Sequence, residues 1–280
     1  MKDNLISWEE SVKWLKDQPD QQELVRHCYY DDPLAVAAER FNNSDEWHAV
    51  LQLLNGFLPG KVLDLGAGRG ISSYAFAKAG CEVTALEPDL STVVGAGAIK
   101  ELVKTTQLPI NVISEYAETL PFSDSSFDIV YGRAVFHHAR DLWQFCSEAS
   151  RVLRKGGVFI ATREHVISRK EDLQSFLCSH PLHHLYGGEN AYLLTEYTEA
   201  ILSSGLRINK IIGPLESAVN YAPMTCKEFE IMITAMLSKR IGKSIAKLIS
   251  SNMAINKLFV RYLSEKKQAP GSLYSFLAVK

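Results

Sequence analysis

The ten residues from Lys61 to Gly70, KVLDLGAGRG, constrain the fold of this chain more than any other stretch. The apolar run 61–65 holds Asp64 and predicts a buried β-strand. Glycines follow at positions 66, 68 and 70, and because glycine lacks a Cβ and adopts positive φ at little cost, a ligand can approach the main chain there. Residues 71–79 predict a helix whose N-terminal amides point at this turn. The stretch therefore predicts a pocket for a nucleotide-type ligand.

The spacing of the glycines indicates which nucleotide the turn accepts. A dinucleotide fingerprint has the pattern G-x-G-x-x-G and would need glycine where this chain has Ile71. The next predicted strand, 81–86, is followed by Glu87, whose carboxylate can accept hydrogen bonds from both hydroxyls of a ribose. Since both nucleotide-binding families share this acid, Glu87 supports the fold more than the identity of the cofactor. An NAD-dependent oxidoreductase stays the less favoured alternative.

Three later segments narrow the choice of cofactor. They are Ala117–Val130, which contains AETLPF and SFDIV, then Gly132–His138 (GRAVFHH), and then Arg151–Gly157 (RVLRKGG). In this order, and together with the glycine turn, they resemble the motifs of the class I S-adenosylmethionine (SAM) methyltransferases. The resemblance is to the ubiquinone/menaquinone-biosynthesis type, methyltransferase type 11, and covers residues 61–160.

This resemblance implies an α/β fold and a set of cofactor contacts. The fold is a doubly wound, Rossmann-like sheet of seven strands in the order 3-2-1-4-5-7-6, with the last strand antiparallel. The reaction is in-line methyl transfer from SAM to a small organic acceptor, which leaves S-adenosylhomocysteine (SAH). The implied cofactor-binding residues are Asp64, Gly66, Ala67, Gly68, Gly70, Glu87, Pro88, Tyr116, Ala117, Glu118, Gly132 and Arg133. Tyr116 departs from the pattern, because relatives commonly carry an acid there.

The hydrophobic periodicity divides the chain into three parts. Residues 1–58 predict a helical N-terminal cap, and residues 59–213 with 271–280 predict the SAM-binding core. Residues 214–270 predict a helical insertion that, by the resemblance, overhangs the cofactor methyl as a lid. The predicted core strands are 61–65, 81–86, 110–114, 127–131, 157–162, 208–212 and 273–279, and the predicted helices of the insertion are 226–238, 241–250 and 254–265.

Catalytic residues are harder to predict, because methyl transfer needs a base only where the acceptor must lose a proton. A histidine near neutral pKa suits that role, and the candidates are His137, His138 and His183. The candidates for acceptor binding are His184, Tyr186, Tyr221 and Tyr30. Residues 179–190, a predicted loop, hold three histidines and Glu189, which are competent metal ligands. No H-E-x-x-H spacing is present, so we assign no metal to the chain.

The composition, and the absence of certain sequence patterns, restrict the partners that we expect this chain to bind. A net charge of −2 gives no basic face for a nucleic acid, and no apolar run is long enough to insert into a membrane. Five cysteines without a C-x-x-C pair, and an N-terminus too acidic for a signal peptide, favour a reduced, cytoplasmic protein. Oxygen, nitrogen and carbon acceptors stay open, as does the oligomeric state. A non-catalytic SAM-binding protein is the second alternative.

Overall fold

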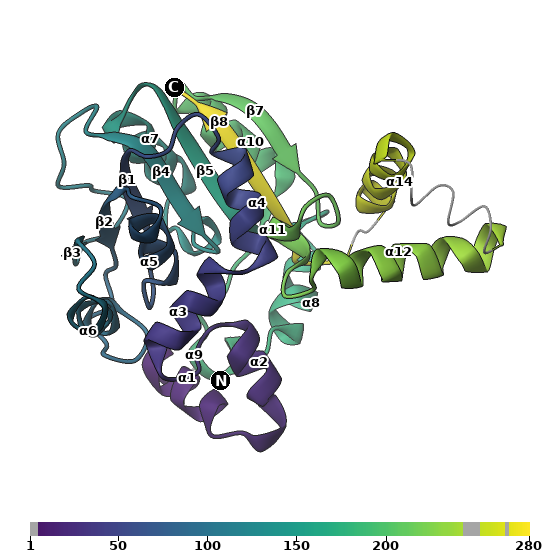
Figure 1. Ribbon diagram of the computed structural model, residues 1–280, viewed down its shortest axis with the longest axis horizontal. Helices are drawn as coiled ribbons and strands as arrows, with labels where there is room; N and C mark the ends of the chain where they lie inside the picture. Colours follow the sequence, from purple (N-terminus) through teal and green to yellow (C-terminus); the bar gives the residue numbers. More distant parts are fainter. Residues whose placement is uncertain (1–4, 243–252, 267–268) are drawn as a thin grey trace.

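The computed structural model describes residues 5–242, 253–266 and 269–280, and it is built around one mixed β-sheet (Figure 1). Within these residues the sheet has eight strands, and its main path has the order β3-β2-β1-β4-β5-β8-β7. The strands are β1 (Lys61–Leu65), β2 (Glu82–Leu86), β3 (Ile110–Ile113), β4 (Phe127–Arg133), β5 (Leu153–Ile167), β6 (Tyr192–Leu193), β7 (Arg207–Ile212) and β8 (Ser272–Val279).

The topology confirms the predicted fold class. Strands β1 to β5 pair in parallel, while β8 runs antiparallel to both β5 and β7. The prediction of seven strands missed the two-residue β6, which pairs with the end of β5 and lies off the main path. Without β6 the order matches the predicted one. Parallel pairing requires crossover connections, and the helices between the strands supply them.

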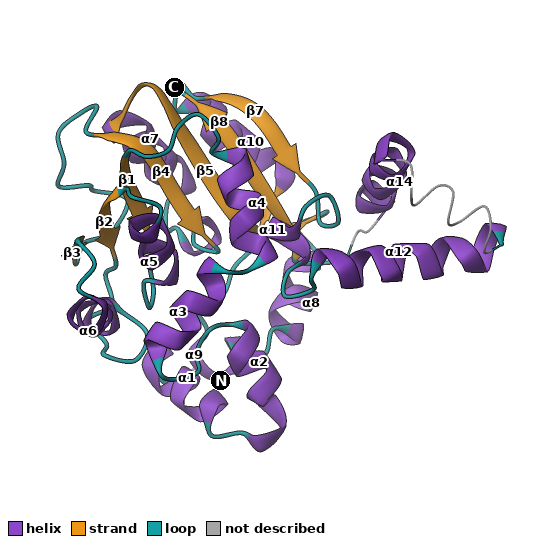
Figure 2. Ribbon diagram, in the orientation of Figure 1, coloured by secondary structure: helices purple, strands orange, loops and turns teal. Residues whose placement is uncertain are grey.

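Helices cover both faces of the sheet (Figure 2). The described helices are α1 (Trp8–Lys16), α2 (Gln22–His27), α3 (Leu34–Asn42), α4 (Asp45–Leu53), α5 (Ile71–Lys78), α6 (Ala96–Thr106), α7 (Leu142–Val152), α8 (Asp172–Ser179), α9 (His183–Tyr186), α10 (Leu194–Ser203), α11 (Ala218–Tyr221), α12 (Cys226–Ile241) and α14 (Met253–Lys266), with short 3-10 helices η1 (Pro19–Gln21) and η2 (Phe136–His138). No described helix is both long and apolar enough to cross a membrane.

The strand period of two divides the core into two layers. Along β4, Ile129 and Tyr131 pack on one face with Trp47 and Phe76, which come from α4 and α5. Val130, between them, packs on the opposite face among side chains of α7 and α10. Both faces of the strand are therefore buried, as expected for the centre of a parallel sheet.

Two segments differ from the predicted elements, and a third is not tested. Strand β5 continues to Ile167 rather than ending at 162, because β8 pairs with it beyond a bulge at Arg163, where φ is +61°. The predicted loop 179–190 contains the short helix α9. Most of the predicted helix 241–250 lies outside the described residues, so the structure does not test it.

A buried ion pair joins the N-terminal helices to the sheet. Glu46, at the start of α4, is 1% exposed, and its Oε1 accepts a hydrogen bond from Arg133 Nε at 2.7 Å. Arg133 is the last residue of β4. Burial alone would raise the pKa of Glu46, but the guanidinium groups of Arg133 and Arg163 hold that pKa below its ordinary value. The carboxylate is therefore ionised and paired.

Replacing Glu46 by alanine removes one partner of this buried pair. Because Arg133 is left charged without its carboxylate, we expect Glu46→Ala to lower the free energy of unfolding by about 3 to 5 kcal/mol. Urea titration followed by circular dichroism measures the change. The control is Glu23→Ala, on the exposed side of α2, which should change the free energy by less than about 0.5 kcal/mol. Equal losses in the two variants would contradict the prediction.

Candidate functional site

A cavity of about 730 Å³ lies at the carboxyl ends of the parallel strands. Its lining comes from the turn after β1, from the ends of β2, β4 and β5, and from α1, α2 and α9. Open α/β sheets place their ligand sites at this edge. On the helical side Trp8 contacts Tyr186, with ring centroids 4.6 Å apart, and Tyr30, at 6.1 Å. The N-terminal helices therefore cover a site whose other walls come from the carboxyl ends of the strands.

The glycine turn has the left-handed backbone conformation that its sequence predicts. Gly66, Gly68 and Gly70 have φ of +56°, +54° and +79°. A Cβ on Gly66 would lie 2.1 Å from Val135 Cγ2, so this glycine is needed for packing. A Cβ on Gly68 would meet nothing closer than a carbonyl oxygen at 3.9 Å, and Gly68 lines the cavity. At Gly68 the bare main chain is therefore open to a ligand.

Glu87 follows β2 and faces the same cavity, although it is only 8% exposed. Its Oε2 accepts a hydrogen bond from Gly68 N at 2.8 Å, and its Oε1 accepts one from Asp89 N at 2.9 Å. Burial raises the pKa of Glu87 to about 7. The carboxylate thus fixes the glycine turn against β2 and lines the space where a ribose is expected.

Asp64 has a different environment from Glu87. It is 1% exposed and lies outside the residues that line the cavity. Its Oδ2 accepts hydrogen bonds from Ser72 Oγ at 2.8 Å and from Ser73 Oγ at 2.5 Å. Burial raises the pKa of Asp64 to about 6. The side chain therefore ties the end of β1 to the first turn of α5, beneath the cavity.

The structure brings most of the other predicted cofactor residues to the cavity. The lining includes Gly66, Ala67, Pro88, Tyr116, Ala117, Glu118 and Arg133, but not Gly70 or Gly132. Tyr116 is half-exposed, and its ring centroid lies 4.6 Å from the guanidinium carbon of Arg140. A Cβ on Gly132 would lie 2.6 Å from Phe136 Cε2, so that glycine serves packing at the end of β4.

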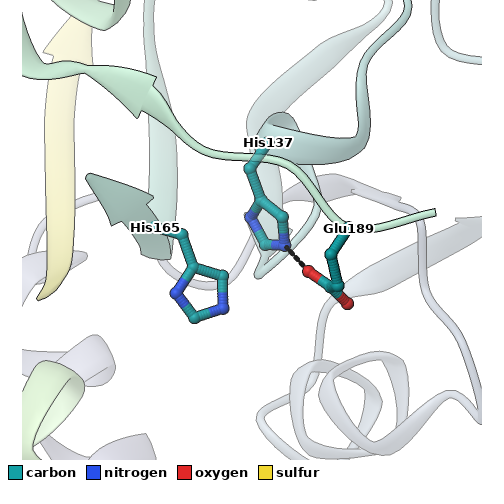
Figure 3. Close-up of side chains that lie close together, drawn as sticks. All are labelled: His137, His165 and Glu189. Carbon is teal, nitrogen blue, oxygen red and sulfur yellow. Dashed lines mark ion pairs between the residues drawn. The ribbon is translucent and has the colours of Figure 1, made fainter. Parts of the chain in front are cut away.

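The opposite part of the lining is rich in histidine. His137 in η2 is 2% exposed, and its Nδ1 lies 2.8 Å from Oε2 of the buried Glu164 on β5. Glu164 also accepts hydrogen bonds from the backbone N–H groups of Val135 and His137. Burial lowers the pKa of His137, and burial raises the pKa of Glu164 to about 7. Figure 3 shows His137 beside His165 and Glu189.

The remaining predicted residues divide between the cavity and the surface. His138, Tyr30 and Tyr186 line the cavity, whereas His183, His184 and Tyr221 do not. Tyr221 stacks on Phe229 of α12, with ring centroids 4.1 Å apart. None of the described residues between 214 and 270 lines the cavity, and α12 and α14 project from the sheet (Figure 1). Helices α1, α2 and α9 enclose it instead.

Sequence reasoning missed several charged or titratable residues of the lining, among them Arg69, Arg163 and His165. Arg69, inside the glycine turn, donates to the carbonyl of Tyr29 at 2.9 Å and so ties the turn to the segment after α2. Arg163 and His165 lie on the part of β5 beyond its predicted end. The sequence did carry a signal for Arg163 and His165, because charged residues within an otherwise apolar strand need buried partners.

Comparison with known proteins shows what this architecture resembles. A family model described as a methyltransferase domain matches residues 63–161. The 27-O-demethylrifamycin SV methyltransferase of Amycolatopsis mediterranei (strain S699) is 32% identical over 139 residues, 48% of this chain and 49% of the relative. The sarcosine/dimethylglycine N-methyltransferase of Halorhodospira halochloris is 38% identical over 102 residues, 36% of each chain. The chain thus spans about half the length, or less, of these curated relatives.

A solved structure extends the likeness beyond the matched domain. The geranyl diphosphate C-methyltransferase from Streptomyces coelicolor A3(2), in complex with Mg²⁺, geranyl diphosphate and S-adenosyl-L-homocysteine, aligns with a TM-score of 0.59. The alignment covers 89% of this chain and 84% of that chain at 14% identity. At this identity the likeness shows the fold alone. Together the comparisons confirm the resemblance predicted from the motifs.

The raised pKa of Glu87 predicts a pH dependence of stability. Between its ordinary value of 4.5 and about 7, the folded protein holds a proton that the unfolded chain releases. The stability that Glu87 contributes is therefore present below pH 4.5 and lost as pH rises through about 7. Relative to Glu87→Gln, we expect the wild type to lose on the order of 2 kcal/mol of unfolding free energy between pH 5 and pH 8.

Urea titrations of both proteins at the two pH values, without added ligand, measure this difference. Asp64 titrates in both proteins, so its contribution cancels. A difference between the two proteins that does not change with pH would show that Glu87 is ionised throughout.

Proposed function

From the methyltransferase domain at residues 63–161 we propose that this chain transfers the methyl group of SAM to a small organic acceptor. The observation that carries the proposal is a single cavity whose lining includes both a candidate cofactor region and a candidate acceptor region. Gly68 and Glu87 line one part, and imidazoles and aromatic rings line the other. When bound, SAM supplies an electrophilic sulfonium methyl and leaves as SAH.

The residues present fit this cofactor. The unobstructed main chain at Gly68 suits the amino acid end of SAM, and the buried Glu87 carboxylate suits the two ribose hydroxyls. Tyr116 and Ala117, on the lining, are proposed to contact the adenine, with Pro88 beneath it. Asp64, Gly70 and Gly132 are then assigned to shaping the turn and the strand ends rather than to direct contact.

The chain contributes mainly by orienting the two reactants and excluding water. Well-oriented groups can supply on the order of 7 to 11 kcal/mol of the barrier reduction, so little covalent help is needed. Where the methyl-accepting substrate must lose a proton, we propose that His138 takes up that proton. Its Nδ1 lies 3.1 Å from the carbonyl oxygen of Gly188, so in the neutral imidazole Nδ1 donates and Nε2 carries the lone pair. His183 stays a weaker candidate, because it lies outside the lining.

The acceptor is proposed to be a small molecule because helices and aromatic side chains cover one side of the cavity. Trp8, Tyr30 and Tyr186 close it from the helical side, and a cavity of about 730 Å³ has room for a nucleoside cofactor and a compact second ligand. The same enclosure disfavours a nucleic acid chain. The division into cap 1–58, core 59–213 with 271–280, and insertion 214–270 is kept as part of this proposal.

Two experiments test the function. Calorimetric titration with SAM, SAH and NAD⁺ should give micromolar binding of the first two and none of the third. NAD⁺ binding without SAM binding would reject the proposal in favour of an oxidoreductase. Incubation of the protein with methyl-labelled SAM and a metabolite extract should yield a labelled small molecule. SAM binding with no labelled product under any condition would favour a non-catalytic SAM-binding protein.

Glu87→Ala tests the proposed ribose contact. Because it removes a buried acceptor of two hydrogen bonds from the ligand, we expect the affinity for SAM to fall by roughly 1 to 3 kcal/mol. Calorimetry on the folded variant measures the change. Glu82→Ala, at the exposed start of the same strand, is the matched control and should bind as the wild type does. An unchanged dissociation constant in Glu87→Ala would show that Glu87 does not hold the ribose.

A further inference from the structure

His137, His165 and Glu189 converge inside the cavity from three separate segments of the chain (Figure 3). His137 lies in η2 after β4, His165 lies near the end of β5, and Glu189 follows α9. One nitrogen or oxygen atom from each of the three lies within 4.8 Å of the others. His137 Nε2 and Glu189 Oε2 are 3.7 Å apart. Two imidazoles and one carboxylate therefore face a common point.

Both imidazoles are held so that Nε2 carries a lone pair. His165 Nδ1 lies 3.0 Å from the carbonyl oxygen of Gly271, which can only accept, so Nδ1 carries the proton. His137 Nδ1 lies 2.8 Å from Oε2 of Glu164, and the ionised Glu164 carboxylate, which also accepts two backbone N–H groups, would hold the proton on Nδ1. Metal-binding histidines are commonly oriented in this way, by a carboxylate or a backbone carbonyl on the other nitrogen.

The Glu189 carboxylate is left incomplete by the surrounding protein. The residue is 9% exposed, and its Oε1 accepts a hydrogen bond from the hydroxyl of Tyr186. Its Oε2 has no hydrogen-bond partner among the described residues. An unpaired buried carboxylate oxygen is costly, and here it faces a nitrogen lone pair. A cation bound between His137 and Glu189 would pair with the carboxylate oxygen and with the nitrogen lone pair.

We propose that His137, His165 and Glu189 bind a divalent transition-metal ion. Two imidazoles with one carboxylate are a ligand set that suits zinc and ferrous iron, and three protein ligands leave coordination positions open. Ligand atoms about 2.1 Å from one ion lie about 3 to 3.5 Å apart, so the cluster needs to contract only slightly. His180 Nε2, 3.6 Å from Glu189 Oε1, is a neighbouring imidazole that stays outside the set of three.

The open positions would face the cavity, because all three ligands line it. The ion is therefore proposed to bind an oxygen or nitrogen atom of the methyl acceptor, and this role rests on the proposed function. Sequence reasoning assigned no metal site, because the residues at 137, 165 and 189 have none of the short spacings that mark metal motifs. The alternative is a proton shared between His137 and Glu189 without any ion.

The test uses the full chain without an affinity tag, treated with a chelator and then titrated with Co²⁺ under visible absorption. We expect about one equivalent to bind with the absorption bands of a low-symmetry site. His165→Ala and Glu189→Gln should weaken Co²⁺ binding by at least about tenfold, since each removes a ligand. His48→Ala, which removes an exposed histidine from α4, is the control and should bind as the wild type does. Equal binding by all four proteins would overturn the proposal.

A second measurement does not depend on the variants folding. Electron paramagnetic resonance of the wild type loaded with one equivalent of Cu²⁺ should show coupling to two imidazole nitrogens, and its absence would overturn the proposal. SAM titration of the same preparations separates the two proposals. Retained SAM binding without specific metal binding rejects the metal site alone, whereas metal binding without SAM binding rejects the proposed function.

Discussion

The buried pairing of Glu46 with Arg133 is the interaction on which the shape of the site depends. Arg133 ends a central strand, and Glu46 begins a helix of the N-terminal cap, so their pairing joins two parts of the chain that are 87 residues apart. The rings of Tyr29 and Phe41 pack against the same guanidinium, at 5.7 and 5.5 Å. Because a charge buried at this depth must keep its partner, the helical cap cannot separate from the sheet without large cost.

The extension of β5 past its bulge has a comparable effect on the other part of the cavity. It carries Glu164, which accepts the backbone N–H groups of the η2 turn and the Nδ1–H of His137. It also carries His165 to within 4.7 Å of the His137 ring. One strand therefore fixes the position, tautomer and surroundings of the histidines, and rigid elements of this kind position functional groups more accurately than loops do.

The lining of the cavity comes from two parts of the chain. The part proposed to contact the cofactor comes from the segment that matches the methyltransferase family model, and includes Gly68, Glu87 and Ala117. The part proposed for the acceptor is built largely outside it, by Trp8 and Tyr30 before the domain and by residues 163–189 after it. The match to the methyltransferase family model therefore says little about the acceptor. The chemistry of the surrounding segments decides it, and that includes the cluster of His137, His165 and Glu189.

Local sequence determined the strand–turn–helix at 61–79 and the position of Glu87, because each depends on residues close together in the chain. The strand order was implied by the family resemblance of the motifs. Local sequence did not determine which helices enclose the cavity, where β5 ends, or that Glu164 orients His137. The described residues of the predicted lid, 214–242, 253–266 and 269–270, do not line the cavity for the same reason. These features depend on contacts between segments far apart in sequence, and burial of charges such as Glu46 and Glu164 is resolved only when the folded chain supplies their partners.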